Sequence, residues 1–189
     1  MLEEPAVALP LPGRHPDEEC ADLREISTSG VWTASSSLPN HGIDNINDRD
    51  LETYWQSCGP QPHTIDVKFA KRKRVLKVSV YMNFPQDESY TACRLSVRGG
   101  PSEYDVQELT YVDLPQITGW THISLEDPPG SGHAPALLAL QFAILTNHLG
   151  GKDTQMRQMR LYSAKSVDIQ GEEDIEFQHE NFLPFLILR

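Results

Sequence analysis

The sequence predicts an all-β protein built as a β-sandwich, and three observations support this class. Apolar residues recur with a period of two in several short segments. Gly, Pro and charged residues typical of turns separate these segments. The chain, at 189 residues, is long enough to bury one ordinary hydrophobic core. Many short strands with such turns are typical of a sandwich or barrel, and a jelly-roll topology fits them.

The individual strands follow from the alternation, because one face of such a strand meets the core and the other meets water. The alternating runs are residues 65–69, 76–82, 95–98 and 123–125. Residues 137–145 are nearly all apolar, which is typical of a central strand covered on both faces. A buried helix is the competing interpretation, since Ala and Leu are good helix formers. We favour a strand because this segment is short and has strands on either side.

Turns are expected between these strands, at residues 71–74, 99–101, 127–130 and 150–151. The first of these is a run of four basic residues. We interpret it as a solvated hairpin turn, with a nuclear localisation signal or a contact patch as the alternative.

The two ends of the chain differ in composition from its middle. Residues 1–21 are rich in proline and acid and predict a disordered leader, followed by a β-domain over residues 22–164. Residues 165–189 predict a flexible acidic tail that closes with an apolar run. The leader lacks the pattern of a signal peptide, and no run approaches the ~20 apolar residues of a membrane helix. We therefore expect no membrane partner.

Charge and cysteine content narrow the setting further. The formal net charge of -11 argues against free nucleic acid as a partner, because phosphates require a basic face. Cys20, Cys58 and Cys93 are an odd number of thiols and give no complete disulfide framework. Such thiols suit a reducing compartment, so we expect the nucleus and cytoplasm. Cys58 and Cys93 are interpreted as small packing residues, since neither has an adjacent His or Lys.

No motif in the sequence predicts catalysis. The chain has no HExxH, paired CxxC, nucleophile elbow or phosphate-binding glycine loop. His63 and His122 fall in predicted strands, where a hydrogen-bonded structural histidine is the favoured interpretation. We therefore expect no enzyme activity, no metal and no cofactor.

Polar and aromatic residues are instead concentrated in three loop segments. These are residues 50–57, residues 87–91, and residues 147–148 with 152–158. Loops at one end of a rigid sandwich are where such folds bind ligands, and this composition suits peptide contacts. Trp55 is equally well interpreted as a core residue, and the acidic loop residues as turn formers.

The same segments resemble a known family. The sequences LETYWQS from Leu51, DESYT from Asp87, and DT with MRQ between Asp153 and Gln158 are similar to the DOC domain, specifically the small DOC subunit of the anaphase-promoting complex. LREI from Leu23, the pair Ser35–Ser36 and QPH from Gln61 fit as well. The similarity runs from about residue 22 to residue 162 and recurs at the C terminus.

This resemblance implies a jelly-roll β-sandwich similar to galactose-binding and discoidin domains. It also implies a non-catalytic subunit of a multi-subunit E3 ubiquitin ligase of the cell cycle. In the family, this subunit forms a co-receptor for the destruction-box degron with a WD40 coactivator, and so raises substrate affinity and processivity. Its C-terminal tail docks in a groove of a TPR subunit.

The resemblance also implies site residues. The tail residues expected at the TPR subunit are Leu188 and Arg189, where the family typically ends in Ile-Arg. Cys58 stands where the family usually has Asp, and Gln155 where it often has His. The residues implied in degron binding are Ser89, Tyr90, Asn147, His148, Asp153, Thr154 and Arg157.

Two other functions compete with this one. A discoidin-like carbohydrate-binding module is the first, because Asp48, Asp50, Thr53 and Trp55 are loosely similar to a discoidin-type loop. Against it, glycan modules of that fold are usually secreted, whereas this chain has no signal peptide and an odd thiol count. The second, a hydrolase on a β-sandwich, lacks any nucleophile–base pair.

Overall fold

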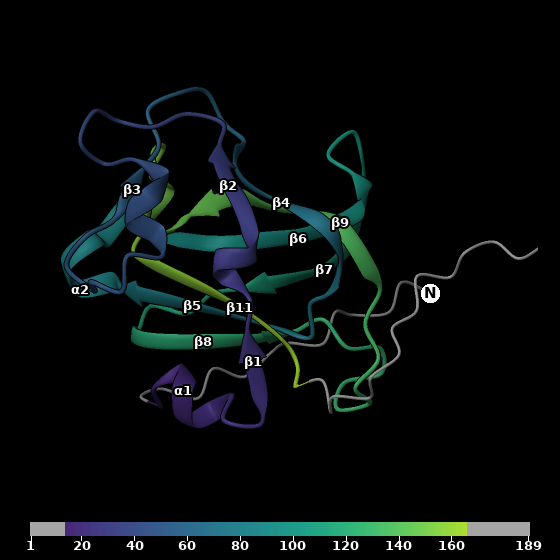
Figure 1. Ribbon diagram of the computed structural model, residues 1–189. Coiled ribbons are helices and arrows are strands. Elements are labelled where there is room, and N and C mark those ends of the chain that lie inside the picture. The colour runs from purple at the N-terminus through teal and green to yellow at the C-terminus, as the bar shows by residue number, and fades with distance from the viewer. Residues whose placement is uncertain (1–13, 166–189) are drawn as a thin grey trace, which may run out of the picture.

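We describe the protein from a computed structural model that describes residues 14–165 (Figure 1). Two antiparallel sheets pack face to face, which confirms the predicted all-β jelly-roll sandwich. The four-stranded sheet has the order β1 (Leu23–Glu25), β11 (Gln158–Ala164), β5 (Lys77–Asn83) and β8 (Thr118–Ser124). The five-stranded sheet has the order β2 (Gly30–Ala34), β4 (His63–Arg74), β9 (Ala136–Asn147), β6 (Ala92–Ser102) and β7 (Asp105–Asp113).

Short elements complete the described part of the chain. β3 (Trp55–Gln56) and β10 (Gln155–Met156) pair separately at one end of the sandwich. The α-helices are α1 (Pro16–Glu19) and α2 (Phe84–Asp87), and the 3-10 helices are η1 (Ser27–Ser29), η2 (Ile43–Ile46), η3 (Glu88–Tyr90) and η4 (His148–Gly150). None of the helices between residues 14 and 165 has the length and apolar character needed to cross a membrane.

The chain passes repeatedly between the two sheets, as in a jelly roll. It moves from β4 to β5, returns to β6 and β7, crosses to β8, returns to β9 and crosses again to β11. The core lies between the sheets and is formed by the inward-facing residues of each strand, for example Val67, Val80 and Phe142, which are almost fully buried. Crossing connections of this kind bring loops that are distant in sequence to the same end.

The apolar segment 137–145 lies in β9, which confirms the strand interpretation over a helix. β9 pairs with β4 on one side and β6 on the other, so it occupies the centre of its sheet. Leu140 and Phe142 face the core, and the adjacent Ala139 and Ala143 are buried too. This burial explains why the segment lacks regular alternation.

Two of the predicted turns are wrong. Residues 99–101 lie within β6, which continues to Ser102, and the basic run 71–74 is not a turn either. β4 continues through Arg74, which pairs with Ala136. The prediction failed because four consecutive charges are typical of a turn, whereas here the strand extends past the end of its neighbour β2, where charged side chains remain in water.

The prediction of a disordered leader is wrong for residues 14–21. α1 begins after His15, whose side chain accepts a hydrogen bond from the backbone of Asp17. Pro16 and Cys20 are buried against the outer face of the four-stranded sheet. There the Arg160 guanidinium pairs with Asp17 at 3.0 Å and lies 5.1 Å from the centre of the Trp120 ring. Proline and acid content suggested disorder, but Arg160, distant in the sequence, supplies a partner.

Candidate functional site

The three loop segments noted in the sequence meet at one end of the sandwich, next to β3 and α2 in Figure 1. Thr91 and Gln155 form an isolated parallel bridge between two of them. The His148 amide donates to the Thr91 carbonyl at 2.9 Å, and the Ser57 amide donates to the Thr154 carbonyl at 2.9 Å. We call this set of residues, 50–58, 84–91 and 147–157, the loop platform.

Arg157 lies inside the loop platform rather than on it. Its side chain is 1% exposed and forms a bidentate ion pair with Asp87, with nitrogen–oxygen distances of 2.8 and 2.6 Å. A third nitrogen donates to the Leu51 carbonyl at 2.8 Å, and the guanidinium lies over the Tyr54 ring. The hydrogen bonds to Asp87 raise the pKa of Arg157 above its ordinary value. Arg157 therefore links all three loops and presents no donor to a ligand.

Asn147 and Thr154 are also buried inside the platform. The Asn147 amide nitrogen donates to the Asp153 carbonyl at 2.6 Å, and its oxygen accepts from the Thr154 hydroxyl at 3.0 Å. The Thr154 amide donates to the Ser57 hydroxyl at 2.8 Å. These bonds satisfy the polar atoms of the β9–β10 connection and fix its shape.

His148 has a structural position as well. Its Nε2 lies 3.0 Å from the Leu114 carbonyl, so Nε2 carries the proton. The ring meets the Phe84 ring edge to face, with 5.3 Å between their centres. His148 is 9% exposed and joins the platform to the β7–β8 connection.

The remaining sequence-predicted residues lie at the surface. Tyr90 is exposed, and Ser89 and Asp153 are half-buried. η3 and η4 lie against each other, which brings Ser89 and Tyr90 next to the β9–β10 connection. The Asp153 carboxylate makes no hydrogen bond or ion pair with any side chain between residues 14 and 165. The predicted set thus divides into three surface residues and four supporting ones.

Leu149 is a surface residue that the sequence analysis missed. It is 71% exposed on η4 and has a positive φ of 53°, an uncommon conformation for a branched apolar side chain. The signal in the sequence was a single leucine before Gly150–Gly151. Gly151 is required there, because a Cβ would lie 1.7 Å from the Ser89 carbonyl oxygen.

A clamp from the β3–β4 connection holds the same loop from the other side. The Gln61 side chain donates to the Lys152 carbonyl at 2.8 Å, and His63 Nε2 donates to the same oxygen at 2.7 Å. His63 is fully buried, which confirms its structural interpretation. His122, which bonds the Ser79 hydroxyl at 2.7 Å, is structural as well.

The loop proposed for sugar binding uses its polar groups internally. Trp55 is 0% exposed and donates to the Ser36 carbonyl at 3.0 Å, so the core interpretation is confirmed. The Asp48 carboxylate accepts from Thr53 at 2.6 Å and from Gln158 at 2.7 Å. These contacts remove the aromatic face and the acid that a sugar would need.

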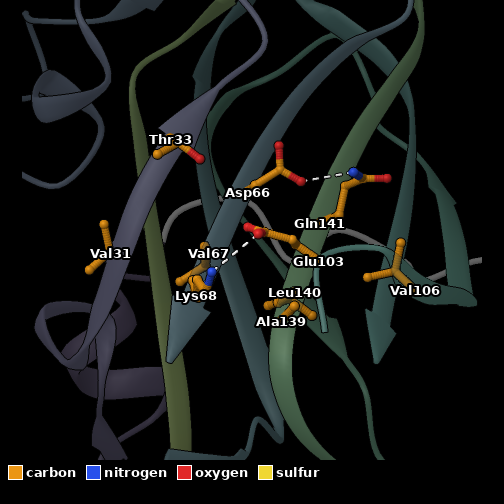
Figure 2. Close-up of a pocket in the computed structure, with 10 residues that line it drawn as sticks. All are labelled: Val31, Thr33, Asp66, Val67, Lys68, Glu103, Val106, Ala139, Leu140 and Gln141. Carbon is orange, nitrogen blue, oxygen red and sulfur yellow. Dashed lines mark hydrogen bonds and ion pairs between the residues drawn. The ribbon is translucent and has the colours of Figure 1, made fainter. Parts of the chain in front are cut away.

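A hollow lies away from the loops, on the outer face of the five-stranded sheet. Figure 2 shows its charged and amide side chains paired with one another: Lys68 with Glu103 at 3.2 Å, and Gln141 with Asp66 at 2.8 Å. None of the lining residues is aromatic. The hollow therefore offers little to a sugar.

The three thiols differ in environment. Cys20 is buried, which raises its pKa. Cys93 is half-buried, but Cys58 is exposed, so the packing interpretation is wrong for Cys58. Cys58 lies two residues after the end of β3, and its amide donates to the Ser36 hydroxyl. Gln155, the other departure from the family pattern, bonds to Gln56 at 2.9 Å.

The two packed antiparallel sheets define the class of fold as a jelly-roll β-sandwich. The CBM32-1 and CBM32-2 domains of Clostridium perfringens ZmpB match 86% of this chain and 42% of that chain, with a TM-score of 0.68 and 12% identity. The F5/8 type C domain of a Bacteroides fragilis protein matches 76% of this chain and 98% of that domain, with a TM-score of 0.62 and 12% identity. At such identities the likeness concerns the fold alone.

The family is defined by sequence. A family model described as "Anaphase-promoting complex, subunit 10 (APC10)" matches residues 12–184, and the chain belongs to this family. The Drosophila melanogaster protein named "Anaphase-promoting complex subunit 10" is 36% identical over 166 residues, which cover 86% of this chain and 84% of that protein. The Mus musculus protein of the same name is 38% identical over 154 residues, which cover 80% and 82%.

Proposed function

We propose that this chain is a non-catalytic substrate-recognition subunit of the anaphase-promoting complex, an E3 ubiquitin ligase. Its relatives bear the name of subunit 10 of that complex. The proposed role is that of a co-receptor for destruction-box degrons, shared with a WD40 coactivator, in the nucleus and cytoplasm. It would promote processive ubiquitination of substrates in the cell cycle.

The observation that carries this proposal is the exposed surface of the loop platform. Tyr90 and Leu149 provide apolar contact area, and Ser89 and Asp153 provide hydrogen-bonding groups beside them. Aromatic side chains surrounded by polar groups are typical of peptide-binding surfaces. Because the loops beneath are fixed by hydrogen bonds and by the Arg157 ion pair, little order is lost when a ligand binds.

The four buried members of the predicted set act indirectly in this proposal. Asn147, His148, Thr154 and Arg157 hold the exposed residues in place and do not themselves meet the degron. Their substitution is therefore expected to reduce both stability and substrate binding, whereas substitution of Tyr90 should affect binding alone.

A non-catalytic contact is sufficient for the proposed effect. Ordering a short degron peptide has an entropic cost, so a single shallow site binds it weakly. A second weak contact supplied by a tethered neighbour acts at high effective concentration and lengthens residence. Longer residence allows more ubiquitin transfers in each encounter.

The proposed attachment to the complex uses residues outside the described part of the chain. Leu188 would enter an apolar pocket of a TPR subunit. Arg189 carries a guanidinium and the terminal carboxylate on one residue, so a groove can recognise both groups at once.

The test is a pair of tyrosine substitutions in the reconstituted ligase. Tyr90→Ala removes an aromatic ring from the loop platform, whereas Tyr104→Ala removes one that is 91% exposed at the β6–β7 turn. The number of ubiquitins added to a destruction-box substrate per binding event should fall only for Tyr90→Ala. Thermal stability should remain unchanged in both variants. Equal processivity of the two variants would contradict the assignment of the degron surface.

A further inference from the structure

The last residues of β4 form a free, strongly basic strand edge. β2 pairs with β4 only as far as Phe69, which lies opposite Gly30. Residues 70–74 extend beyond this partner, and no backbone hydrogen bond joins them to another described residue on that side. Figure 1 shows β4 continuing past β2 before the chain turns toward β5. We call residues 70–74 the basic edge.

The pairing on the other side of the basic edge is interrupted as well. Lys68 pairs with Ala139, but the next pair is Lys73 with Leu137, so residues 69–72 of β4 lie opposite residue 138 alone. Such a bulge leaves strand residues without ladder partners and redirects the strand. Backbone donors and acceptors in the basic edge are therefore available to an added strand.

The charges on the basic edge have no ionic partner within the described part of the chain. Lys71, Arg72, Lys73 and Arg74 form no ion pair with any residue from 14 to 165; Lys73 is half-buried and the other three are exposed. By contrast, the neighbouring Lys68 pairs with Glu103 at 3.2 Å. Four like charges on a free strand edge repel a second copy of the same edge, which is a common protection against self-association. An acidic strand meets no such repulsion.

This chain also carries an acidic segment, which follows the last described residue. Residues 166–181 contain six acids and no Lys or Arg, and Glu172, Glu173 and Asp174 are consecutive. The described chain leaves β11 at Lys165, and the Leu76 amide donates to the Tyr162 carbonyl at 2.8 Å. Arg74 is two residues before Leu76 and Lys165 is three residues after Tyr162, so both lie near this hydrogen bond. The seven residues from Lys165 to Glu172 span up to about 25 Å, enough to reach the edge.

We propose that the acidic segment around Glu172–Asp174 pairs with the basic edge of β4 in the same molecule, through added strand hydrogen bonds and complementary charge. The inference does not depend on the proposed function. The contact would shorten the tether that leads to Leu188 and Arg189 and would cover four cations that otherwise attract foreign acidic chains.

The test is hydrogen–deuterium exchange of the full chain, read by mass spectrometry on peptides that contain residues 70–74. A tethered segment acts at about millimolar effective concentration, so a contact with a dissociation constant of about 0.1 mM slows exchange about tenfold. The triple variant Glu172→Gln, Glu173→Gln, Asp174→Asn should remove this protection. The control Glu3→Gln, Glu4→Gln neutralises acids in the other terminal segment and should leave it intact.

A charge exchange makes the test specific. Lys71→Glu with Lys73→Glu should abolish protection, and adding Glu172→Lys with Glu173→Lys should restore it. Equal exchange of residues 70–74 in the unmodified chain and the triple variant would overturn the proposal. So would protection that appears only when a separate acidic peptide is added, because the edge would then serve another molecule. A melting temperature within error of the unmodified chain ensures that the sandwich remains folded in each variant.

Discussion

The buried pair of Asp87 and Arg157 gives the sharpest prediction for stability. Asp87→Ala removes the carboxylate that receives two hydrogen bonds from Arg157, and both side chains are at most 4% exposed. Removing one partner of a buried ion pair leaves an uncompensated charge and costs about 3–5 kcal/mol. The Leu51 carbonyl and the Tyr54 ring still contact the guanidinium, so we expect the lower value.

A loss of about 3 kcal/mol lowers the melting temperature of a domain of this size by about 6–12 °C. The assay is thermal unfolding followed by circular dichroism, with urea unfolding as a second measure. The matched control is Asp113→Ala, which removes the acid of the bidentate pair with Arg94 at the surface. That pair is half-exposed on both sides, and surface pairs contribute little to stability.

The double variant Asp87→Ala, Arg157→Met separates the two possible causes of the loss. Replacing both partners of a buried pair by apolar groups is often neutral, so the double variant should recover most of the stability. If Asp87→Ala and Asp113→Ala lowered the melting temperature equally, the buried pair would not be the link between the loops that its geometry indicates.

Three further results are expected. Burial lowers the pKa of His122 below its usual 6.5, so at lower pH the folded state binds fewer protons than the unfolded state. The free energy of unfolding should therefore fall as pH drops below about 6.5. In urea titrations, His122→Gln should make the free energy of unfolding depend less on pH. Gly151→Ala should push the loop away from the Ser89 carbonyl, and should reduce substrate ubiquitination strongly while lowering the melting temperature only slightly. Unchanged ubiquitination would show that the loop tolerates the shift. Deleting Leu188 and Arg189 should weaken co-purification with the TPR subunit and leave the melting temperature unchanged. If the truncated protein still co-purified fully with the TPR subunit at high salt, tail docking would be disproved.

Much of the fold could be predicted from local pattern. The alternation at residues 65–69 predicts the inward face of β4, and the apolar run 137–145 predicts the central strand. Both work because neighbouring residues in the sequence show whether one face of a strand or both faces are buried. The basic run 71–74 was assigned wrongly, since a strand that extends past its neighbour and a turn place the same charges in water.

The sequence predicted where the candidate site lies, but not which of its residues are exposed and which are buried. The three loops were identified by composition, and they do meet. Whether Arg157 faces a ligand or Asp87 depends on a contact between residues 70 positions apart, which no local pattern encodes. Leu149 was missed for the opposite reason, because a lone leucine in a polar loop carries no periodic signal.

The position of α1 determines where a recombinant domain can begin. The sequence suggested a start at Asp22, but that fragment would lack Asp17, which pairs with Arg160, and Cys20, which lies buried against the sheet. The indole of Trp120 would also become more accessible to solvent and to other molecules, because the fragment would lack the His15 ring, which meets it edge to face. Limited proteolysis should therefore leave residues 14–21 attached to the sandwich, and fragments that begin after Cys20 should aggregate during purification.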